Sequence, residues 1–343
     1  MGRRVRSRRQ REWPFLMRTV GQLGLAACWI VGLALVAWNV MRFYPGDSWF
    51  PVRLGNYFAP WLLMVAALAT LVAALGRRRW LTGLVGLSTL LLLGRFWPLL
   101  TPHLTSDLAY ATINSAPRLR VMTFNVHYSN RNAAGIAQLI QEQAADVVAF
   151  QEFTRELGDP LHSQLATAYP YYLPDDARQP RLALISRYPL TALPPGPWRT
   201  QRARLDLPAA SVVVWNVHAM PAISRSGWEW QRRGLEALGR EVAAEPSPIV
   251  VLGDFNTTDQ NENYRLVAEH LLDVHRAIGW GFGFTFPDTR LYLPALPRLG
   301  PVLRIDHIFV SQHWAPQDIQ VIPDGHGSDH LPVIATLRLI QHP

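Results

Sequence analysis

Residues 248–256 read PIVVLGDFN, an apolar run that passes directly into a polar turn. The run predicts a short buried β-strand, because β-branched residues dominate it and Gly253 follows it. The same arrangement recurs across the C-terminal two thirds of the chain, where polar residues able to bind metals or move protons follow apolar strands. They are Asn125, Glu152, His218, Asp254 with Asn256, Asp306 with His307, and Asp329 with His330. Because a rigid sheet brings strand ends from distant parts of the sequence into one crevice, these residues predict a functional site.

Strand-like and helix-like patterns alternate around these residues. Residues 118–127 (RLRVMTFNVH) have the alternation of a strand, and residues 132–143 have the apolar spacing of a helix. Residues 224–244 predict a second helix, which begins at a serine cap. Further strands are predicted over 146–150, 181–186, 211–219, 248–252, 303–310 and 331–339. Such a mixture is typical of a layered α/β domain with a central pair of sheets.

Charge divides the chain of 343 residues into two different parts. All 33 basic residues are arginines, and the formal net charge is +8. Residues 1–100 contain 13 arginines and 2 acidic residues, whereas residues 117–343 contain 20 arginines and 22 acidic residues. An apolar fraction of 49% with 17% charged residues excludes a wholly disordered chain. The single cysteine, Cys28, excludes an intramolecular disulfide framework and a cysteine-based zinc cluster.

The first hundred residues have the composition of a membrane segment. After an arginine-rich arm over residues 1–18, the chain is uncharged over 19–41, long enough to cross about 30 Å of hydrocarbon. Residues 59–75 and 80–100 predict two further spans, the last with Arg95 snorkelling to the interface or facing a neighbouring helix. We therefore expect a three-helix transmembrane segment over 19–100, followed by a linker over 101–117. Two spans with a re-entrant or interfacial segment are the alternative.

The arginines also predict the orientation of this segment. Seven arginines precede the first span and Arg77–Arg79 separate the second from the third, so both stretches are expected in the cytoplasm. Three crossings then place the chain after about residue 101 outside the cytoplasm, whereas an even number keeps it inside. We expect a multi-pass protein of the cell (inner) membrane with an extracytoplasmic C-terminal domain. The sequence LAAC at 25–28 fits a lipoprotein signal, but the apolar run continues beyond it, which disfavours cleavage there.

Six short motifs occur in order along the C-terminal domain. They are TFNVH (123–127), QE (151–152), NVHAMP (216–221), GDFN (253–256), RIDHIF (304–309) and SDHLPV (328–333). Together they resemble the endonuclease/exonuclease/phosphatase superfamily, which includes deoxyribonuclease I and the neutral sphingomyelinases. The resemblance covers about residues 118–343 and implies a four-layer αββα sandwich. It also implies hydrolysis of phosphate esters with Mg²⁺, or Mn²⁺ as the alternative ion, and it implies nothing about the membrane segment.

The resemblance gives a metal-binding role to some of the polar residues at the strand ends. Glu152 matches the principal metal carboxylate of the superfamily, with Asn125 and Asp329 beside it. Mg²⁺ prefers hard oxygen ligands and keeps several waters, so few carboxylates are enough. Asp254 and Asn256 match the pair that orients the attacking water and holds the phosphate or a second metal. A turn-forming Asx motif after a strand is the structural alternative for this pair.

Two histidines complete the implied catalytic set. His330 matches the essential histidine of the superfamily, and Asp306 matches the carboxylate that pairs with it and raises its basicity. His218 matches a second histidine, near the leaving group, in the deoxyribonuclease and sphingomyelinase branches. The nuclease branch supports that histidine with a carboxylate just before the strand at 181–186. This chain has glutamine and proline there, so the partner of His218 is left open.

Further residues beside the motifs are candidates for contact with substrate. They are His127, Tyr128, Arg181 and Arg304. His307 is expected to point away from the side of Asp306, because side chains alternate along a strand. The segment Gly279–Pro301 is rich in glycine, proline and aromatic residues and poor in charge. It is either a lip that faces lipid or a bulky substrate, or a packed crossover loop.

Three functions follow as hypotheses. The first is a membrane-anchored phosphodiesterase or phosphatase that acts outside the cytoplasm on a lipid-linked phosphate, because tethering keeps the site near the bilayer. The second is an extracytoplasmic nuclease like deoxyribonuclease I, which the slight excess of acidic residues in the domain disfavours, since DNA binding needs a basic surface. A non-catalytic scaffold is a minor alternative, because the metal-binding and water-orienting residues are all present. No protein partner is inferred.

Overall fold

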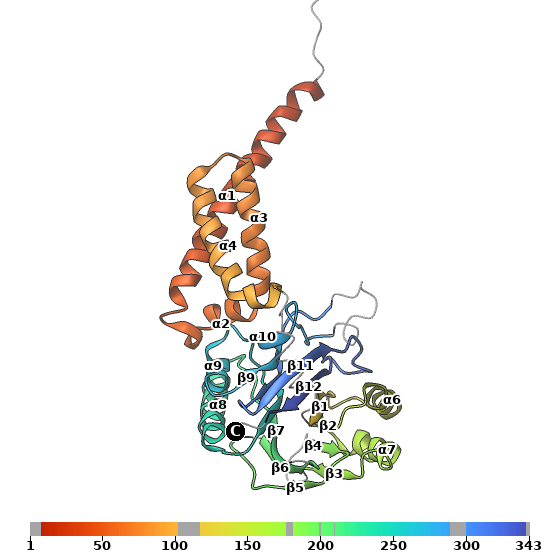
Figure 1. Cartoon of the computed structure of the whole chain (residues 1–343). Helices are drawn as coiled ribbons and strands as arrows, with labels where there is room; N and C mark the ends of the chain where they lie inside the picture. Colours follow the sequence, from red (N-terminus) through yellow and green to blue (C-terminus); the bar gives the residue numbers. More distant parts are fainter. Residues whose placement is uncertain are drawn as a thin grey trace, which may run out of the picture. The chain divides into compact units, whose positions relative to one another are not determined.

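The computed structural model describes residues 8–101, 117–175, 181–198, 200–208, 210–288 and 300–340, without the side chains of residues 8–18 and Arg181. The chain divides into two compact units, Met1–Trp97 and Pro98–Pro343 (Figure 1). The predicted boundary between membrane segment and catalytic domain, the linker over 101–117, lies almost wholly outside the described residues.

The N-terminal unit is helical. Its elements are α1 (Arg8–Met41), the 3₁₀ turn η1 (Gly46–Ser48), α2 (Phe50–Tyr57), α3 (Ala59–Leu75) and α4 (Arg79–Leu100). Helices α1, α3 and α4 pack on one another through a buried apolar cluster that includes Cys28, Ala69, Ala73, Leu81 and Val85. Small residues at such contacts let helix backbones approach closely, as in membrane helix bundles. Large apolar side chains on other faces of these helices, such as those of Ile30, Leu68 and Leu90, are exposed.

Two of the described helices are long and apolar enough to cross a membrane. They cover Thr19–Met41 and Arg79–Leu100, in agreement with the first and third predicted spans. The second predicted span coincides with α3, but α3 reaches the required length only together with α2, from which it is bent by 81°. Pro60 in the first turn of α3 accompanies this bend. The unit therefore contains two candidate spans, or three if the bent pair crosses as one broken span.

The C-terminal unit contains two mixed β-sheets of six strands each. The first sheet has the order β11-β12-β1-β2-β4-β3, and the second has the order β5-β6-β7-β8-β10-β9. In the first sheet the strands are β1 (Arg118–Asn125), β2 (Val147–Phe153), β3 (Tyr171–Pro174), β4 (Arg181–Ser186), β11 (Trp314–Val321) and β12 (Val333–Leu339). In the second they are β5 (Leu190–Ala192), β6 (Thr200–Asp206), β7 (Ser211–His218), β8 (Ile249–Asp254), β9 (Leu272–Asp273) and β10 (Asp306–Val310).

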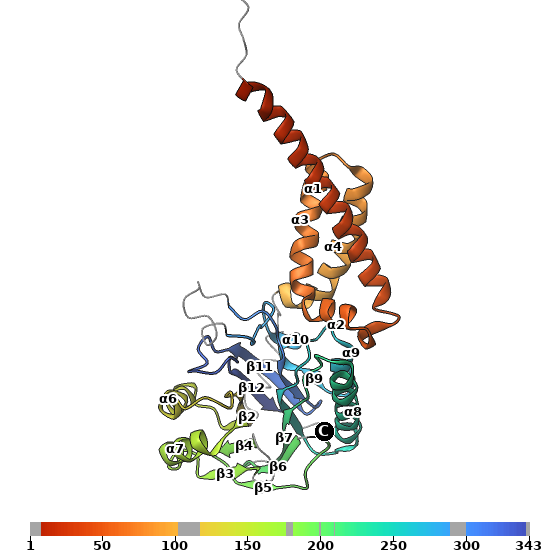
Figure 2. The same cartoon turned by 180° about the vertical axis from the view of Figure 1, so that it is seen from behind.

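Side chains that alternate along the strands build three apolar layers. Leu119 and Val121 of β1 belong to the core between the two sheets, whereas Met122 and Phe124 belong to the core under the helices. Helices α6 (Ala133–Gln143) and α7 (Arg155–Leu165) cover the outer face of the first sheet, and α8 (Arg225–Ala244) and α9 (Glu262–Ala268) cover the second. The two helix pairs lie on opposite sides in both views (Figures 1 and 2). A short helix, α10 (Val274–Ile278), follows β9. The α/β sandwich expected from the sequence is therefore present.

Candidate active site

The register of the central strands brings the predicted polar residues to one edge of the sandwich. Strands β1 and β2 are parallel, with Asn125 opposite Gln151, next to Glu152. Strands β7 and β8 are also parallel, with His218 opposite Asp254, and β10 pairs Asp306 with Asp254 from the other side. Parallel neighbours end at the same edge, so the side chains that end them converge there.

Glu152 and Asn125 form the part of the site that the first sheet contributes. Nδ2 of Asn125 donates to Oε1 of Glu152 at 3.3 Å and to Oδ2 of Asp254 at 3.0 Å. The backbone N–H of Tyr128 donates to Oε2 of Glu152 at 3.1 Å. Glu152 has a φ of 53°, where the pairing of β2 with β4 is irregular. Non-glycine residues rarely adopt this conformation, and strain of this kind is concentrated at functional sites.

The GDFN turn holds Asp254 in a fixed orientation. Gly253 has a φ of 152°, and a Cβ there would lie 1.9 Å from the carbonyl oxygen of Val217 on β7. The backbone N–H of Asn256 donates to Oδ1 of Asp254 at 2.8 Å, which is the Asx turn anticipated as the structural alternative. The side-chain amide of Asn256 donates to Oδ2 of Asp254 at 3.2 Å and to the carbonyl of Ala219 at 3.0 Å. The turn thus aims Asp254 while the carboxylate still faces the site.

His330 and Asp306 form a buried pair. Nδ1 of His330 lies 2.9 Å from Oδ2 of Asp306, and its Nε2 lies 3.8 Å from Oδ2 of Asp254. Ser328 positions this segment, because its hydroxyl donates to the carbonyl of Asn125 at 2.6 Å and accepts from the backbone N–H of His330 at 3.0 Å. Asp254, Asp306 and His330 place one ligand atom each within 4.8 Å of one another.

Burial and neighbouring charges act in opposite ways on this cluster. Burial raises the pKa of Asp254 to about 7, with a contribution from Asp306 and opposition from His330. For His330, burial lowers the pKa, but the charges of Asp306 and Asp254 outweigh it and raise the pKa to about 10. At neutral pH these shifts favour a protonated, positively charged His330 next to Asp254, whose carboxyl group can exchange a proton.

His218 completes the ring of side chains around Asp254. Its Nε2 lies 3.7 Å from Oδ2 of Asp254 and 3.8 Å from Oε1 of Glu152. The acids that face this imidazole are therefore members of the site itself. The stretch where the nuclease branch carries a supporting carboxylate, residues 176–180, lies outside the described residues.

Other predicted residues have more varied places. Asp329, which precedes His330 in the sequence, is buried, and its charge contributes to the raised pKa of His330. Tyr128 is exposed, and its ring packs against that of His127 at 4.7 Å. The backbone N–H of His127 donates to Oδ1 of Asn125 at 3.1 Å. The side chain of Arg181 is not among those described.

The surroundings of Arg304 differ from those expected of a residue that contacts substrate. Its guanidinium is buried and lies 2.8 Å from Asp273 and 3.2 Å from Asp259. It also lies 3.0 Å from Nδ1 of His307, whose ring packs among Phe255 and Tyr264. His307 thus points into the core, as the alternation along the strand predicts. Arg304 belongs to a buried ion network behind the site and is not brought together with the other candidate residues.

Hydrogen-bonding residues to which the sequence analysis gave no role also support the site. Gln231 of α8 donates to the carbonyls of Met220 and Asn256, both at 2.8 Å. Gln151 donates to Oδ1 of Asn216 at 2.8 Å and so joins the two sheets beside the site. Both Gln151 and Asn216 are fully buried. Gln151 and Asn216 belong to the QE and NVHAMP motifs, whereas Gln231 is signalled only as a polar residue on the apolar stripe of a helix.

The donor set is suitable for a hard divalent cation. Glu152 and Asp254 contribute carboxylate oxygens that both accept hydrogen bonds from the side-chain amide of Asn125, and hard oxygen ligands of this kind suit such a cation. Oδ1 of Asp306 is buried without a hydrogen-bond partner among the described residues. Buried carboxylate oxygens normally have such partners, so a cation or polar ligand at this edge is consistent with the arrangement.

The two-sheet sandwich and the buried carboxylate–histidine cluster at its edge agree with the family that the sequence motifs resemble. Residues 122–330 match the Endonuclease/Exonuclease/phosphatase family, and the chain belongs to this family. Enzymes of the family are typically phosphoester hydrolases that use divalent metal ions. A search of curated proteins found none that matches this chain.

Solved structures show the same fold at low sequence identity. An endonuclease/exonuclease/phosphatase from Beutenbergia cavernae is 23% identical, with a TM-score of 0.53 over 66% of this chain and 72% of that chain. A protein of the same description from Bacteroides vulgatus is 21% identical, with a TM-score of 0.51 over 65% and 99% of the two chains. D. rerio TDP2, complexed with single strand DNA product, is 16% identical, with a TM-score of 0.54 over 64% and 99%.

Proposed function

We propose that this chain is a membrane-anchored, metal-dependent phosphoester hydrolase that acts outside the cytoplasm on a lipid-linked phosphate. One observation carries the hydrolase assignment: Oδ2 of Asp254 lies within 3.8 Å of Asn125, His218 and His330, each from a different segment of the chain. Family membership supports the chemistry, and the apolar helices of the N-terminal unit support the lipid substrate.

The residues divide the work of hydrolysis among themselves. Glu152 and Asn125, with Asp329, are the proposed holders of the metal, which when bound would neutralise phosphate charge and lower the pKa of water. Asp254 accepts a proton from the attacking water, and Asn256 keeps its carboxylate in place. The imidazolium of His330, held by Asp306, stabilises the negative charge that develops on the phosphate oxygens. His218 donates a hydrogen bond or proton to the leaving group.

The location is proposed from the arginine distribution and the span count. If α2 and α3 cross the membrane as one broken span, three crossings place the C-terminal unit on the side opposite the arginine-rich N-terminus. A reporter fused after Pro343 tests this location in bacteria. Activity of an alkaline phosphatase fusion without fluorescence of a GFP fusion is expected, and the reverse result would place the domain in the cytoplasm.

The test of activity uses the full chain in lipid nanodiscs with Mg²⁺. Release of phosphate or headgroup from phospholipids or polyprenyl pyrophosphates is expected. Glu152→Gln should reduce the rate by at least about 100-fold, because it removes the charge of the principal metal ligand. Glu229→Gln changes an exposed glutamate on α8 that pairs with Arg225, and it should retain wild-type activity as the matched control. Equal rates in the two variants would reject the assigned site.

A nuclease is the second candidate function. The structural likeness to D. rerio TDP2 in complex with single strand DNA product favours it. Single-stranded and duplex DNA are therefore incubated with the same nanodiscs. Cleavage of DNA with lipids untouched would overturn the lipid assignment and leave the helices as a tether.

A further inference from the structure

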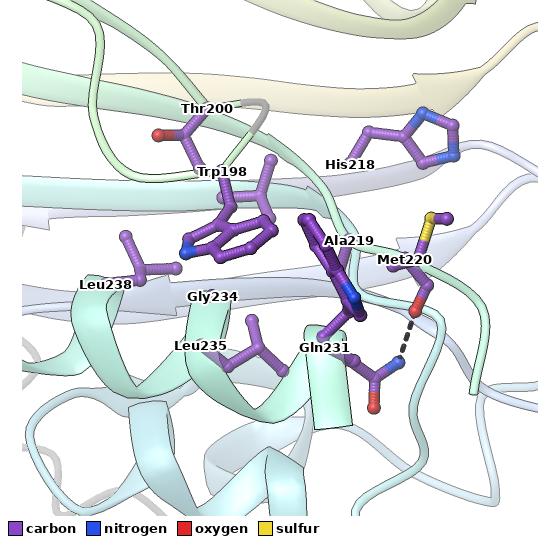
Figure 3. A pocket seen from close by; sticks show the side chains of 11 residues that line it. Trp198, Thr200, His218, Ala219, Met220, Gln231, Gly234, Leu235 and Leu238 are labelled. Carbon is purple, nitrogen blue, oxygen red and sulfur yellow. Dashed lines mark hydrogen bonds between the residues drawn. The ribbon is translucent and has the colours of Figure 1, made fainter. Parts of the chain in front are cut away.

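An apolar cavity of about 180 Å³ lies beside the candidate active site (Figure 3). Leu235 and Leu238 of α8 line it from one side, and Val217 of β7 lines it from the sheet. His218, the residue that follows Val217, lines the same cavity and also lies 3.7 Å from Asp254. His218 therefore links the cavity to the candidate site, and none of the residues proposed to hold the metal lines the cavity.

Two tryptophans form the outer wall of this cavity. Trp198 and Trp230 meet edge to face, with ring centroids 4.3 Å apart and planes at 88°. Gly234 of α8 makes room for Trp198, because a Cβ at this position would lie 3.0 Å from Cβ and Cγ of that tryptophan. Both tryptophans are partly exposed, so they separate the cavity from solvent without being part of the core.

The cavity presents hydrocarbon to whatever enters it. Its polar neighbours have partners within the protein: the Thr200 hydroxyl donates to the carbonyl of Pro197, and the Gln231 amide donates to backbone carbonyls. Among the described residues that line it, none is an arginine, an aspartate or a glutamate. Apart from His218 at one end, the lining is largely apolar; such a wall binds apolar groups and gives little support to a nucleic acid backbone.

A second hollow lies next to the cavity. This open depression of about 410 Å³ shares Met220 and Trp230 with the cavity and adds Pro221 and Ile223. Ile223 is 78% exposed and Met220 is 45% exposed, which is unusual for large apolar side chains that lie next to one another. The two hollows thus share part of their apolar lining, and we refer to them together as the apolar track, with His218 at its inner end.

We propose that this track binds the hydrocarbon chain of the phosphoester substrate, with the phosphate at Asp254 and His330 and the chain between Trp198 and α8. This inference rests on the proposed hydrolase function and specifies its substrate. A cavity of about 150 Å³ holds benzene, so this one takes a chain segment of roughly six to eight carbons. A nucleobase fits less well, because stacking needs an open aromatic face and the two indoles meet edge to face.

The test measures chain-length dependence with the full protein in nanodiscs and Mg²⁺. Alkyl phosphates and alkyl methyl phosphates from one to ten carbons serve as substrates below their micellar concentrations. We expect kcat/KM to rise about three- to fourfold per methylene and to level off near eight carbons. Alkylphosphonates of the same lengths, which cannot be hydrolysed, are titrated by calorimetry, with empty nanodiscs as the blank. Their Kd should fall with the same increment.

Substitutions in the lining of the cavity test whether it causes the chain-length dependence. Trp230→Ala removes the outer wall and should flatten the dependence of kcat/KM and Kd on chain length. Gly234→Leu adds a side chain at the cavity and should shorten the length at which the rise ends. Tyr171→Ala removes a partly exposed aromatic ring from β3 in the other sheet and should retain the wild-type increment.

The outcomes separate this inference from the proposed function. Hydrolysis with no dependence on chain length would support the proposed hydrolase function but overturn the assignment of the track to a hydrocarbon chain. A chain-length increment in Kd without hydrolysis of any ester would support the track and reject the proposed function. An increment that persists in Trp230→Ala, or a nucleotide ester that depends on Trp230 as strongly as an octyl ester does, would overturn the assignment of the track.

Discussion

The pair of His330 and Asp306 shows how one carboxylate sets the protonation and orientation of a proposed catalytic group. Because Nδ1 of His330 faces Asp306, its Nε2 is directed toward Asp254. Asp306→Asn keeps the shape but removes the charge that holds this arrangement. We expect kcat/KM to fall by about 100-fold or more, in the range of a lost acid–base group. Steady-state kinetics on the nanodisc protein check this, and Asp318→Asn on β11 is the control. A loss below threefold would remove Asp306 from the mechanism.

Arg304 permits a prediction about stability at the same scale. Its removal leaves Asp259 and Asp273 as buried negative charges without their shared cation. Arg304→Met should therefore destabilise the C-terminal unit by about 3–5 kcal/mol. Arg225→Met, which breaks an exposed pair with Glu229, should cost less than about 1 kcal/mol. Unfolding in urea, followed by tryptophan fluorescence, measures both. Similar stability in the two variants, with a raised KM for Arg304→Met, would restore Arg304 as a substrate contact.

Chemistry-bearing residues were easier to predict than the residues that position them. Asn125, Glu152, His218 and Asp254 each follow an apolar strand, and the fold brings them together; their individual roles remain predictions. Gln231 and Ser328 act through hydrogen bonds to backbone carbonyls and N–H groups. Apart from the N–H of His330, these partners come from segments distant in the sequence, so a local pattern does not identify them.

At the scale of elements, the predicted strands and helices of the C-terminal unit agree with the structure to within a few residues. Several shorter or more polar elements were not predicted. Strand β6 reads TQRARLD and carries arginines on its outer face, β11 contains Pro316 with a register shift, and α7 contains Pro160. A proline or several charged residues hide the sequence pattern of a strand or helix. The element still forms because it pairs with a neighbouring strand or packs on the sheet.

The β7–β8 pair contains a site where a single methyl group is expected to disrupt the fold. Gly253 approaches the backbone of Val217 so closely that any Cβ would clash with its carbonyl. Gly253→Ala should therefore cost at least about 3 kcal/mol, because neither the φ nor the space suits alanine. Gly300→Ala is the control, since a Cβ there meets nothing within 4 Å. Urea unfolding compares them, and a loss below about 1 kcal/mol for Gly253→Ala would show that β7 and β8 separate easily.

At the scale of the whole molecule, acid should unfold the C-terminal unit through its buried ion network. Burial opposes ionisation of Asp259 and Asp273, but Arg304 outweighs it, so both pKa values lie below the ordinary 3.8. The folded state then binds fewer protons than the unfolded state in acid. The stabilisation is complete above about pH 5 and is lost progressively as the pH falls past the unfolded-state value and through the folded-state values.

Thermal unfolding of the full chain between pH 7 and pH 3 measures this dependence. Asp259→Asn should give a shallower loss of stability with acid, because one of the titrating groups is gone. Asp318→Asn should follow the wild-type curve. An identical slope for Asp259→Asn would assign the acid transition to other carboxylates.

The amide bridge between Gln151 and Asn216 has a consequence for how the site can be disturbed. Glu152 and Asn125 belong to one sheet, whereas His218, Asp254 and Asp306 belong to the other. The site therefore lies between the two sheets, and the distance between the sheets sets the distance from the proposed metal ligands to the proposed base. A substitution in the buried core that moves the sheets apart by a fraction of an ångström should slow the reaction, even though every proposed catalytic side chain is still present. The spacing of the sheets is in this sense part of the active site.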